Sequence, residues 1–253
     1  MIHLKSERET ERIRASCRLA AEAMARVQEA ICPGVTTAQL DEVADAYIRS
    51  QGAVASALGY RGYPRSICVS VNEVVVHGIP GSRALAEGDI LSVDIAVKKD
   101  GYHGDMNVTF AVGQVSEAAQ RLLETAREAM ERGLAASTVD HRLGDLGHAI
   151  QSFVESRGYS VVRDYCGHGI GRTFHEEPQV LHFGTPGTGR RLERGFVFTV
   201  EPMVNEGSYG VRLLDDSWTA VTDDGRLSAQ FEHTVAVTAD GPEVLSRFAD
   251  LPY

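Results

Sequence analysis

The sequence has few cysteines, and their spacing does not suggest cross-links. Cys17, Cys32, Cys68 and Cys166 stand far apart and form no Cys-x-x-Cys pair. Disulfide scaffolds and structural zinc sites both depend on grouped cysteines, so the sequence argues against both classes. The 253 residues, of which 43% are hydrophobic and 24% charged, are enough to bury a core without such cross-links.

Long apolar segments and a surplus of positive charge are also missing. No run approaches the ~18 apolar residues that cross a membrane, and the charged N-terminal segment lacks the apolar stretch of a signal peptide. The chain has 25 basic and 35 acidic residues, a formal net charge of -10. Nucleic-acid-binding modules usually carry a basic surplus. We therefore predict a cytoplasmic protein with no membrane partner and no nucleic-acid specificity.

Apolar spacing and turn signals predict an α+β fold. Helical spacing covers residues 5–31 and, after a capping-box signal at Thr36 and Gln39, continues to about residue 49. Strands are predicted at 66–71 and 90–97, and Asp100-Gly101 predicts a hairpin that returns to Phe110. Further helices are predicted at 117–136 and 143–157, and further strands at 159–165, 196–204, 217–221 and 231–238.

Each half of the chain thus has two helices followed by strands. The halves, about 1–112 and 116–239, share this layout without sequence identity, and no linker rich in Pro, Gly and Ser separates them. We predict one compact domain over residues 1–253, a two-layer α/β unit in which helices back a mostly antiparallel sheet. The repeated order suggests pseudo-twofold architecture.

Two aspartates of the predicted hairpin are the first candidates for chemistry. Asp94 interrupts an apolar strand, and Asp105 lies on the returning arm. A turn centred between Lys99 and Asp100 would place them about opposite each other, ~5 Å apart on one face. Two carboxylates at that distance from each other require a shared proton or a cation between them. The alternative is that Asp105 is a turn or cap residue.

The second half adds two carboxylates and an imidazole. Glu201 and Glu232 are each embedded in an apolar strand, where unpaired acids are rare. His168 lies in the glycine-rich segment 166–178, and the alternative for it is an ordinary loop or core histidine. This segment has neither the spacing nor the lysine of a phosphate-binding loop.

Taken together, these residues indicate a metal site. Four carboxylates and an imidazole form an oxygen-rich set that suits two bridged divalent ions better than one structural zinc. Two ions ~3.5–4 Å apart can share a water, lower its pKa and polarise a carbonyl. The residues alone therefore predict a two-metal hydrolase.

A series of short segments extends this prediction. They are Gly59–Pro64, Ser70–Pro80, Val93–Ile95, His103–Asp105, Gly167–Gly171, Phe174–Pro178, Thr199–Met203 and Ser228–Thr234. In this order, over about residues 5–239, they resemble the type I methionine aminopeptidases, the short form found in bacteria. The resemblance implies the pseudo-symmetric pita-bread fold, with a curved, mostly antiparallel sheet backed by helices.

The resemblance also implies roles for the acidic residues and for two histidines. A dinuclear centre would be held by Asp94, Asp105, His168, Glu201 and Glu232. Asp105 and Glu232 would bridge the ions, Asp94 would bind one, and His168 and Glu201 the other. His77 would contact the scissile amide, His175 would hold the substrate carbonyl, and Glu201 would act as general base. The alternative for His77 is a strand-end histidine satisfied by backbone.

The implied substrate pocket is largely aromatic. The resemblance places a methionine side chain among Tyr60, Tyr63, Cys68, Phe174 and Trp218, with His77 and His175 beside it. A thioether against aromatic rings is a favourable contact. The alternative for Phe174 and Trp218 is ordinary core packing. Ala57 stands where some relatives carry a cysteine, so a thiol is absent there.

The implied function is removal of the initiator methionine from nascent proteins, with preference for a small second residue. The cofactors would be two divalent ions of cobalt, manganese, iron or zinc. The expected partners are the N-termini of nascent polypeptides, with transient ribosome association, and the expected state is a monomer. Two rivals remain, an Xaa-Pro peptidase and a non-catalytic binding protein of the same fold. The first usually needs a further N-terminal domain, and the complete ligand set argues against the second.

Overall fold

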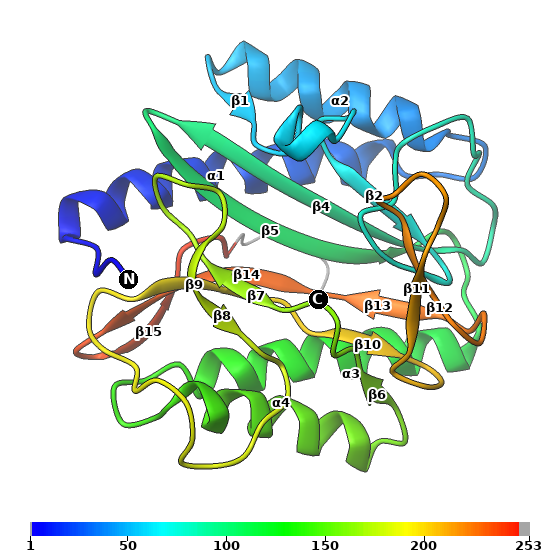
Figure 1. The fold of residues 1–253 in the computed structure, drawn as a ribbon. Helices are drawn as coiled ribbons and strands as arrows, with labels where there is room; N and C mark the ends of the chain where they lie inside the picture. The colour runs from blue at the N-terminus through cyan, green and yellow to red at the C-terminus, as the bar shows by residue number, and fades with distance from the viewer. Residues whose placement is uncertain (1, 248–253) are drawn as a thin grey trace.

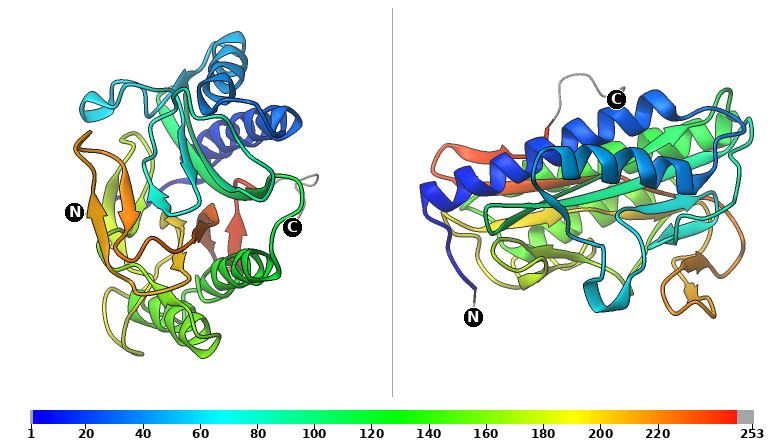
Figure 2. Two further views of the ribbon diagram at one scale, coloured as in Figure 1. Left: turned by 90° about the vertical axis from the view of Figure 1, so that its right-hand side faces the viewer. Right: turned by 90° about the horizontal axis from the view of Figure 1, so that it is seen from above.

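The computed structural model describes residues 2–247. Two pairs of helices lie on the same side of a curved sheet, one pair above the other in Figure 1, and the views of Figure 2 agree. The helices are α1 (Glu7–Ala30), α2 (Thr37–Ser50), α3 (Glu117–Ala135) and α4 (Leu143–Ser156). Their two pairings, α1 with α2 and α3 with α4, leave the other side of the sheet free to carry a site.

Within the described residues, nine strands form the main sheet, and all of its pairings are antiparallel. Its members are β1 (Val54–Ala55), β2 (Cys68–Val71), β4 (Ile90–Lys99), β5 (Tyr102–Ala111), β14 (Glu232–Thr238), β15 (Gly241–Val244), β9 (Val197–Val200), β7 (Gly167–Gly169) and β8 (Glu176–Val180). The predicted α+β class with a mostly antiparallel sheet is confirmed.

Two small sheets of three strands flank the main one. The first contains β13 (Ser228–Gln230), β10 (Met203–Asn205) and β6 (Ser160–Val161). The second contains β11 (Val211–Leu213), β12 (Ala220–Thr222) and β3 (Val74–Val76). A short 3-10 helix covers Tyr60–Gly62. The second small sheet joins the two halves of the chain, because β3 comes from the first and β12 from the second.

The helices begin where their capping residues predict. The side chain of Thr36 accepts a hydrogen bond from the backbone N–H of Gln39, as the capping-box signal indicates. At α1, Ser6 and Glu9 form the same reciprocal pair, so the helix begins two residues later than residue 5. The helices predicted at 117–136 and 143–157 are also confirmed to within a residue.

Several strands are shorter than the sequence predicts, and one prediction merges two strands. The predicted strand 196–204 is divided into β9 and β10, which belong to different sheets. The break falls at Glu201 and Pro202, and a proline lacks the N–H that a continuous ladder needs. The strand predicted at 159–165 is shorter in the structure and corresponds to β6. The strand predicted at 217–221 begins and ends later and corresponds to β12.

The hairpin of β4 and β5 has a register different from the predicted one. Lys99 pairs with Tyr102, so Asp94 lies opposite Asn107, and Asp105 opposite Ala96. The turn residues Asp100 and Gly101 have φ of 47° and 81°, as a two-residue turn of the Asp-Gly type requires. The aspartates are therefore diagonal neighbours. They still share a face, because the two-residue offset preserves the alternation of the strand.

The helix α1 packs closely against β5. A Cβ atom at Gly104 would lie 2.4 Å from the backbone nitrogen of Cys17, so only glycine permits this approach. Ser16 donates a hydrogen bond to the carbonyl of Tyr102 at the same contact. This contact supports the strand that carries Asp105 from behind. Among the described residues, no helix is both long and apolar enough to cross a membrane.

Candidate active site

The acidic candidates come from neighbouring strands of the main sheet. Asp94 on β4 pairs with Asn107 on β5, which in turn pairs with Glu232 on β14. Asp105 lies two residues before Asn107 and shares its face of the strand. Glu201 follows β9, the next strand after β14. The sheet therefore brings together carboxylates that are more than a hundred residues apart in the chain.

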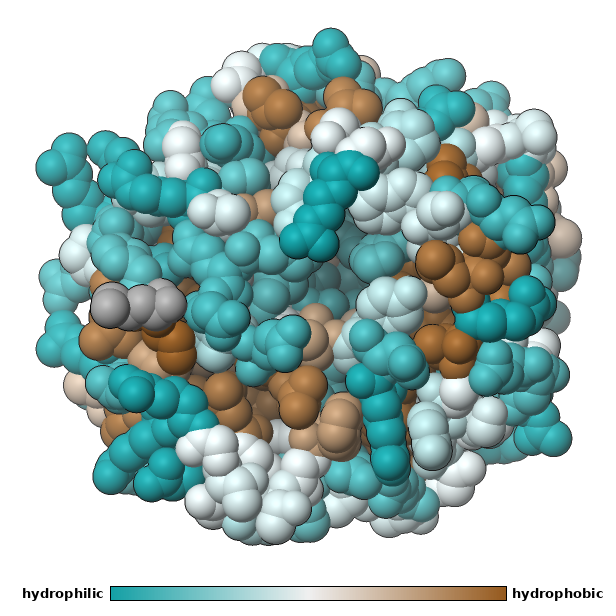
Figure 3. Space-filling model, in the orientation of Figure 1, coloured by the Kyte–Doolittle hydropathy of each residue, from teal (hydrophilic) through white to brown (hydrophobic). Residues whose placement is uncertain are grey.

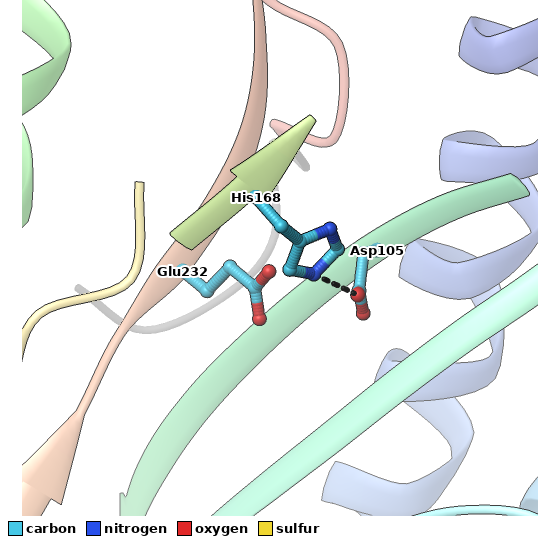
Figure 4. Close-up of side chains that lie close together, drawn as sticks. All are labelled: Asp105, His168 and Glu232. Carbon is cyan, nitrogen blue, oxygen red and sulfur yellow. Dashed lines mark ion pairs between the residues drawn. The ribbon is translucent and has the colours of Figure 1, made fainter. Parts of the chain in front are cut away.

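Three of these residues form a compact group with ligand geometry. One ligand atom each from Asp105, His168 and Glu232 lies within 4.8 Å of the others, and all three side chains are buried. Figure 4 shows their polar ends turned toward one another from three strands. Glu201 adjoins the group, because its Oε1 is 3.7 Å from Nε2 of His168.

The orientation of His168 suits a ligand. Its Nδ1 is 3.0 Å from the carbonyl oxygen of Gly169. Because a carbonyl only accepts, Nδ1 carries the proton, and the lone pair of Nε2 faces the carboxylates. Nε2 is 3.7 Å from Oδ2 of Asp105. Burial lowers the pKa of His168, but Asp105 and Glu201 outweigh it and raise the pKa above its ordinary value.

Polar residues that the sequence did not single out hold the ligands in place. The hydroxyl of Thr199 donates to Oε1 of Glu201 at 2.6 Å, and the amide of Gln230 donates to Oε2 at 3.2 Å. Asn107 donates to Gln230 and accepts from the hydroxyl of Ser92.

A simple signal would have found most of these supporting residues. Ser92, Asn107, Thr199 and Gln230 each lie two positions from a candidate ligand, the spacing at which side chains of an extended chain point to the same side. His182 is different. It is fully buried, and its Nε2 accepts a hydrogen bond from the backbone N–H of Glu201 at 3.1 Å. No local pattern marks it, because it lies on a separate loop.

The group is electrostatically unfavourable without a cation. Burial, followed by the charges of Asp105 and Glu201, raises the pKa of Asp94 well above its ordinary value. Burial and the charges of Asp105 and Glu201 also raise the pKa of Glu232 well above its ordinary value. The pKa of Glu201 is raised to about 7, mainly by burial. Such shifts show that the negative charges lack compensation from the protein itself.

The unsatisfied atoms of the group fit a divalent ion. Within residues 2–247, the buried oxygens Oδ1 of Asp105 and Oε1 of Glu232 have no hydrogen-bond partner. Buried polar atoms are nearly always paired, so a ligand of positive charge is the natural partner for these two. The donors are carboxylates and one imidazole, which suits divalent transition ions.

A cavity of about 250 Å³ opens beside this group and brings together every candidate of the sequence analysis. The surface is hollowed near the middle of the face shown in Figure 3. The cavity is lined by the candidates Tyr60, Tyr63, Cys68, His77, Asp94, Asp105, His168, Phe174, His175, Glu201, Trp218 and Glu232, and by Ala57.

The aromatic candidates form two groups, and ring contacts join the members of each group. Tyr60 contacts Phe174 and His175, with ring centroids 5.1 and 5.0 Å apart. Tyr63 contacts Trp218 at 5.1 Å, and its buried hydroxyl donates to the carbonyl of Gly78. The rings thus line an apolar recess next to the carboxylates.

The two histidines reach the cavity from different directions. His77 follows β3, has a φ of 59° and contacts Tyr165 and Trp218. Burial lowers its pKa to about 4, so its ring is neutral at pH 7. The ring of His175 lies 4.0 Å from that of His168, centroid to centroid. Both rings therefore flank the candidate ligands.

Comparison with known sequences gives a consistent result. The model of metallopeptidase family M24 matches residues 11–239. Methionine aminopeptidase A of Synechocystis sp. is 49% identical over 97% of this chain and 97% of its own length. Methionine aminopeptidase 1 of Bacillus subtilis is 47% identical over 98% of this chain and 100% of its own.

Comparison with solved structures finds methionine aminopeptidases at high identity and other proteins of the same fold at low identity. Methionine aminopeptidase from Rickettsia prowazekii matches with a TM-score of 0.96 and 44% identity, over 98% of this chain and 100% of its own. Prolidase from Pyrococcus furiosus, at 20% identity and a TM-score of 0.78, shares the fold alone, over 97% of this chain and 66% of its own. The pita-bread fold expected from the resemblance is confirmed. This chain is a metal-dependent hydrolase that belongs to metallopeptidase family M24, among its methionine aminopeptidases.

Proposed function

We propose that this protein removes the initiator methionine from nascent polypeptides and prefers substrates with a small second residue. The observation that carries the proposal is the buried group of Asp105, His168 and Glu232, whose ligand atoms lie within 4.8 Å beside an aromatic cavity. The names of the relatives, which are methionine aminopeptidases from several bacteria, support the same substrate.

The proposed centre holds two divalent ions. Asp105 and Glu232 would contribute ligands to both ions, Asp94 to one, and His168 and Glu201 to the other. The two buried oxygens without hydrogen-bond partners, Oδ1 of Asp105 and Oε1 of Glu232, support the bridging roles. When bound, such ions lower the pKa of a water and polarise the substrate carbonyl. Manganese, iron, cobalt and zinc all accept this set of ligands.

The other residues position the substrate and move protons. Glu201 takes the proton of the attacking water as general base. His175 donates a hydrogen bond to the substrate carbonyl oxygen as negative charge develops on it. His77 contacts the scissile amide and assists departure of the leaving amine. Its neutral ring, with a pKa of about 4, supports this role, because a neutral imidazole can both accept and donate.

The methionine side chain occupies the aromatic recess. Its walls are formed by the aromatic rings of Tyr60, Tyr63, Phe174 and Trp218 and by the small, buried side chain of Cys68. Sulfur–aromatic contacts of ~0.3–1.5 kcal/mol each favour methionine over an aliphatic residue of similar size.

Metal analysis and hydrolysis of a Met-Ala-Ser peptide test this proposal together. We expect two ions per chain, release of methionine, and loss of turnover after exhaustive chelation. Asp105→Ala and Glu232→Ala should nearly abolish turnover, whereas Asp240→Ala, which removes an exposed acid, should not. Full activity of the chelated protein or of either bridging variant would contradict the metal centre.

The same assay separates the rival functions. Cleavage of an Xaa-Pro peptide but not of Met-Ala-Ser would identify a prolidase-like enzyme, and metal binding without either activity would identify a binding protein. A Met-Leu-Ser peptide tests the preference for a small second residue. A peptide that begins Met-Ile should also stay uncut, because isoleucine is a large second residue.

The cellular setting is also part of the proposal. The enzyme acts as a monomer in the cytoplasm on emerging N-termini, with transient contact to the ribosome. The net charge of -10 supports the absence of a general nucleic-acid-binding face. Sedimentation of the purified protein, alone and with ribosomes, tests the state and the contact.

A further inference from the structure

Two histidines of the cavity, His77 and His175, each contact a tyrosine from the opposite half of the chain. The ring of Tyr60 is stacked on that of His175 at 5.0 Å and 18°. The ring of Tyr165 meets that of His77 edge-on at 5.4 Å. Each tyrosine is next in sequence to a charged, exposed residue that also lines the cavity, Arg61 beside Tyr60 and Asp164 beside Tyr165. The exposed rim of the cavity, which we call its entrance, therefore carries one charge of each sign, Arg61 next to Tyr60 and Asp164 next to Tyr165.

The backbone directs Arg61 toward the cavity. Arg61 has a φ of 49° and lies between Gly59 and Gly62, whose φ values are 77° and 91°. A left-handed conformation is unfavourable for arginine, so the tight turn imposes it. The turn is closed by a 2.9 Å hydrogen bond from the N–H of Tyr63 to the carbonyl of Tyr60. The guanidinium then lies over the Tyr60 ring, 5.3 Å from its centroid.

The charge of Arg61 is uncompensated. Within the part of the chain that the structure describes, no ion pair and no side-chain hydrogen bond involves Arg61. Arginines close to Arg61 and Asp164 in sequence are paired, since Arg65 contacts Asp41 at 3.8 Å and Arg163 contacts Glu155 at 3.9 Å. An arginine that is free, oriented and adjacent to a binding cavity is suited to recognise a carboxylate.

We propose that Arg61 forms a subsite for an acidic side chain at the third residue of the substrate. This inference rests on the proposed function, in which His175 holds the carbonyl of the first residue. The guanidinium of Arg61 and the ring of His175 both contact the Tyr60 ring, at 5.3 and 5.0 Å from its centroid. An extended chain advances ~3.3 Å per residue, so the third residue comes within reach of Arg61. Asp164, which also lines the cavity, repels a carboxylate and so opposes binding near itself.

The test compares two peptides that differ only in charge, Met-Ala-Asp-Leu and Met-Ala-Asn-Leu. We expect kcat/KM of the metal-loaded wild type to favour the aspartate peptide by about threefold to fivefold, the range of an exposed ion pair. The ratio should fall to about one in Arg61→Gln and below one in Arg61→Glu. It should also fall in 0.5 M salt, because exposed charges are screened there.

Two further variants make the result specific to the side chain. Arg61→Gly removes the guanidinium and relieves the backbone conformation, so it should fold and still lose the discrimination. Arg65→Gln removes a neighbouring arginine that does not line the cavity, and it should keep the wild-type ratio. A wild-type ratio of one, or a ratio unchanged in both Arg61→Gln and Arg61→Gly, would overturn the subsite. Failure of the wild type to cleave either peptide would overturn the proposed function, and the subsite with it.

Discussion

Four carboxylates converge on one small volume, those of Asp94, Asp105, Glu201 and Glu232. The charges of the first three each disfavour ionisation of at least one neighbour. Burial is the first cause of the raised pKa of Asp94, Glu201 and Glu232, and the neighbouring carboxylates add to it. The arrangement is therefore costly for the metal-free protein and becomes favourable only when cations are bound. The carboxylates that the proposed metal binding requires thus oppose the stability of the metal-free fold.

This opposition predicts how the stability of the metal-free protein changes with pH. Burial raises the pKa of Glu201 to about 7 in the folded protein, from an ordinary value of 4.5. A raised pKa means that the folded state binds the proton more tightly, so its contribution to stability is full below pH 4.5 and is lost as the pH rises through 7. Urea unfolding in the presence of a chelator should show this decline.

The variant Glu232→Gln should reduce the decline, because it removes one of the repelling buried carboxylates. We expect the chelated variant to be more stable than the chelated wild type at pH 7.5 by ~1–3 kcal/mol, and the gain to disappear when metal is added. A chelated variant less stable than the wild type would mean that the ionised Glu232 is already compensated.

The roles of the histidines can be separated from those of the ligands. In His77→Ala we expect kcat to fall ~100-fold or more, as for loss of one proton-transfer group, while the metal content stays at the wild-type level. His77 contacts the rings of Tyr165 and Trp218, and the candidate ligands belong to other strands. Metal analysis and steady-state kinetics on the same preparation check this. A large loss of metal would place His77 among the ligands.

At the scale of elements, an N-terminal segment outside the sheet supports the loop that carries His175. Lys5 is nearly inaccessible, with a side chain 2% exposed, and its Nζ lies 2.6 Å from Oε2 of Glu176. The other carboxylate oxygen of Glu176 accepts the N–H of Thr173. The absence of a side chain at Gly171 leaves room for Lys5. A buried ion pair thus joins the start of α1 to the residue after His175.

A mutant cycle on this pair should show strong coupling. Lys5→Met should cost ~3 kcal/mol, because it leaves the partly buried carboxylate of Glu176 without its partner. Adding Glu176→Gln should recover part of the loss. As a matched control, Arg14→Met on α1 removes more solvent-accessible ion pairs, with Glu11 and with Glu243 of β15, and should cost under ~1 kcal/mol for each pair. Urea unfolding of the metal-loaded single variants, the double variant and the control measures these changes in stability. If the effects of Lys5→Met and Glu176→Gln were additive, the two residues would not interact.

At the scale of the whole molecule, the two halves share one sheet and one core. β5 of the first half pairs with β14 of the second, through Asn107 with Glu232 and Met106 with His233. The main hydrophobic cluster includes Met24 and Val93 as well as Ile150 and Phe198. Neither half can bury its side of this cluster by itself.

We therefore expect one cooperative unfolding transition for the metal-loaded protein, in agreement with the predicted single domain. Fragments 1–112 and 116–239, expressed separately, should lack fixed tertiary structure because each exposes a sheet edge and an apolar face. Calorimetry of the whole chain and near-ultraviolet circular dichroism of the fragments measure this. Two resolved transitions, or a folded fragment, would show that the halves are independent domains.

Much of the fold and the candidate metal ligands follow from local sequence, whereas the two flanking histidines and the aromatic pocket came from the family resemblance. Capping residues such as Thr36 and Ser116 set helix starts, since they act on backbone groups only three residues away. Asp100-Gly101 specifies the hairpin for the same reason. An acid within an apolar strand, as at Asp94 and Glu232, is conspicuous without a structure because burying an unpaired charge is unfavourable.

Other features depend on residues that are distant in the chain, and only the tertiary structure decided them. These are the order β4-β5-β14-β9-β7, the division of β9 from β10, and the support of Glu201 by His182. The crosswise contacts of Tyr60 with His175 and of Tyr165 with His77 belong with them. Local patterns record which groups a segment must bury or cap. Which strands then become neighbours depends on the packing of the whole chain, and therefore so does the geometry of the site.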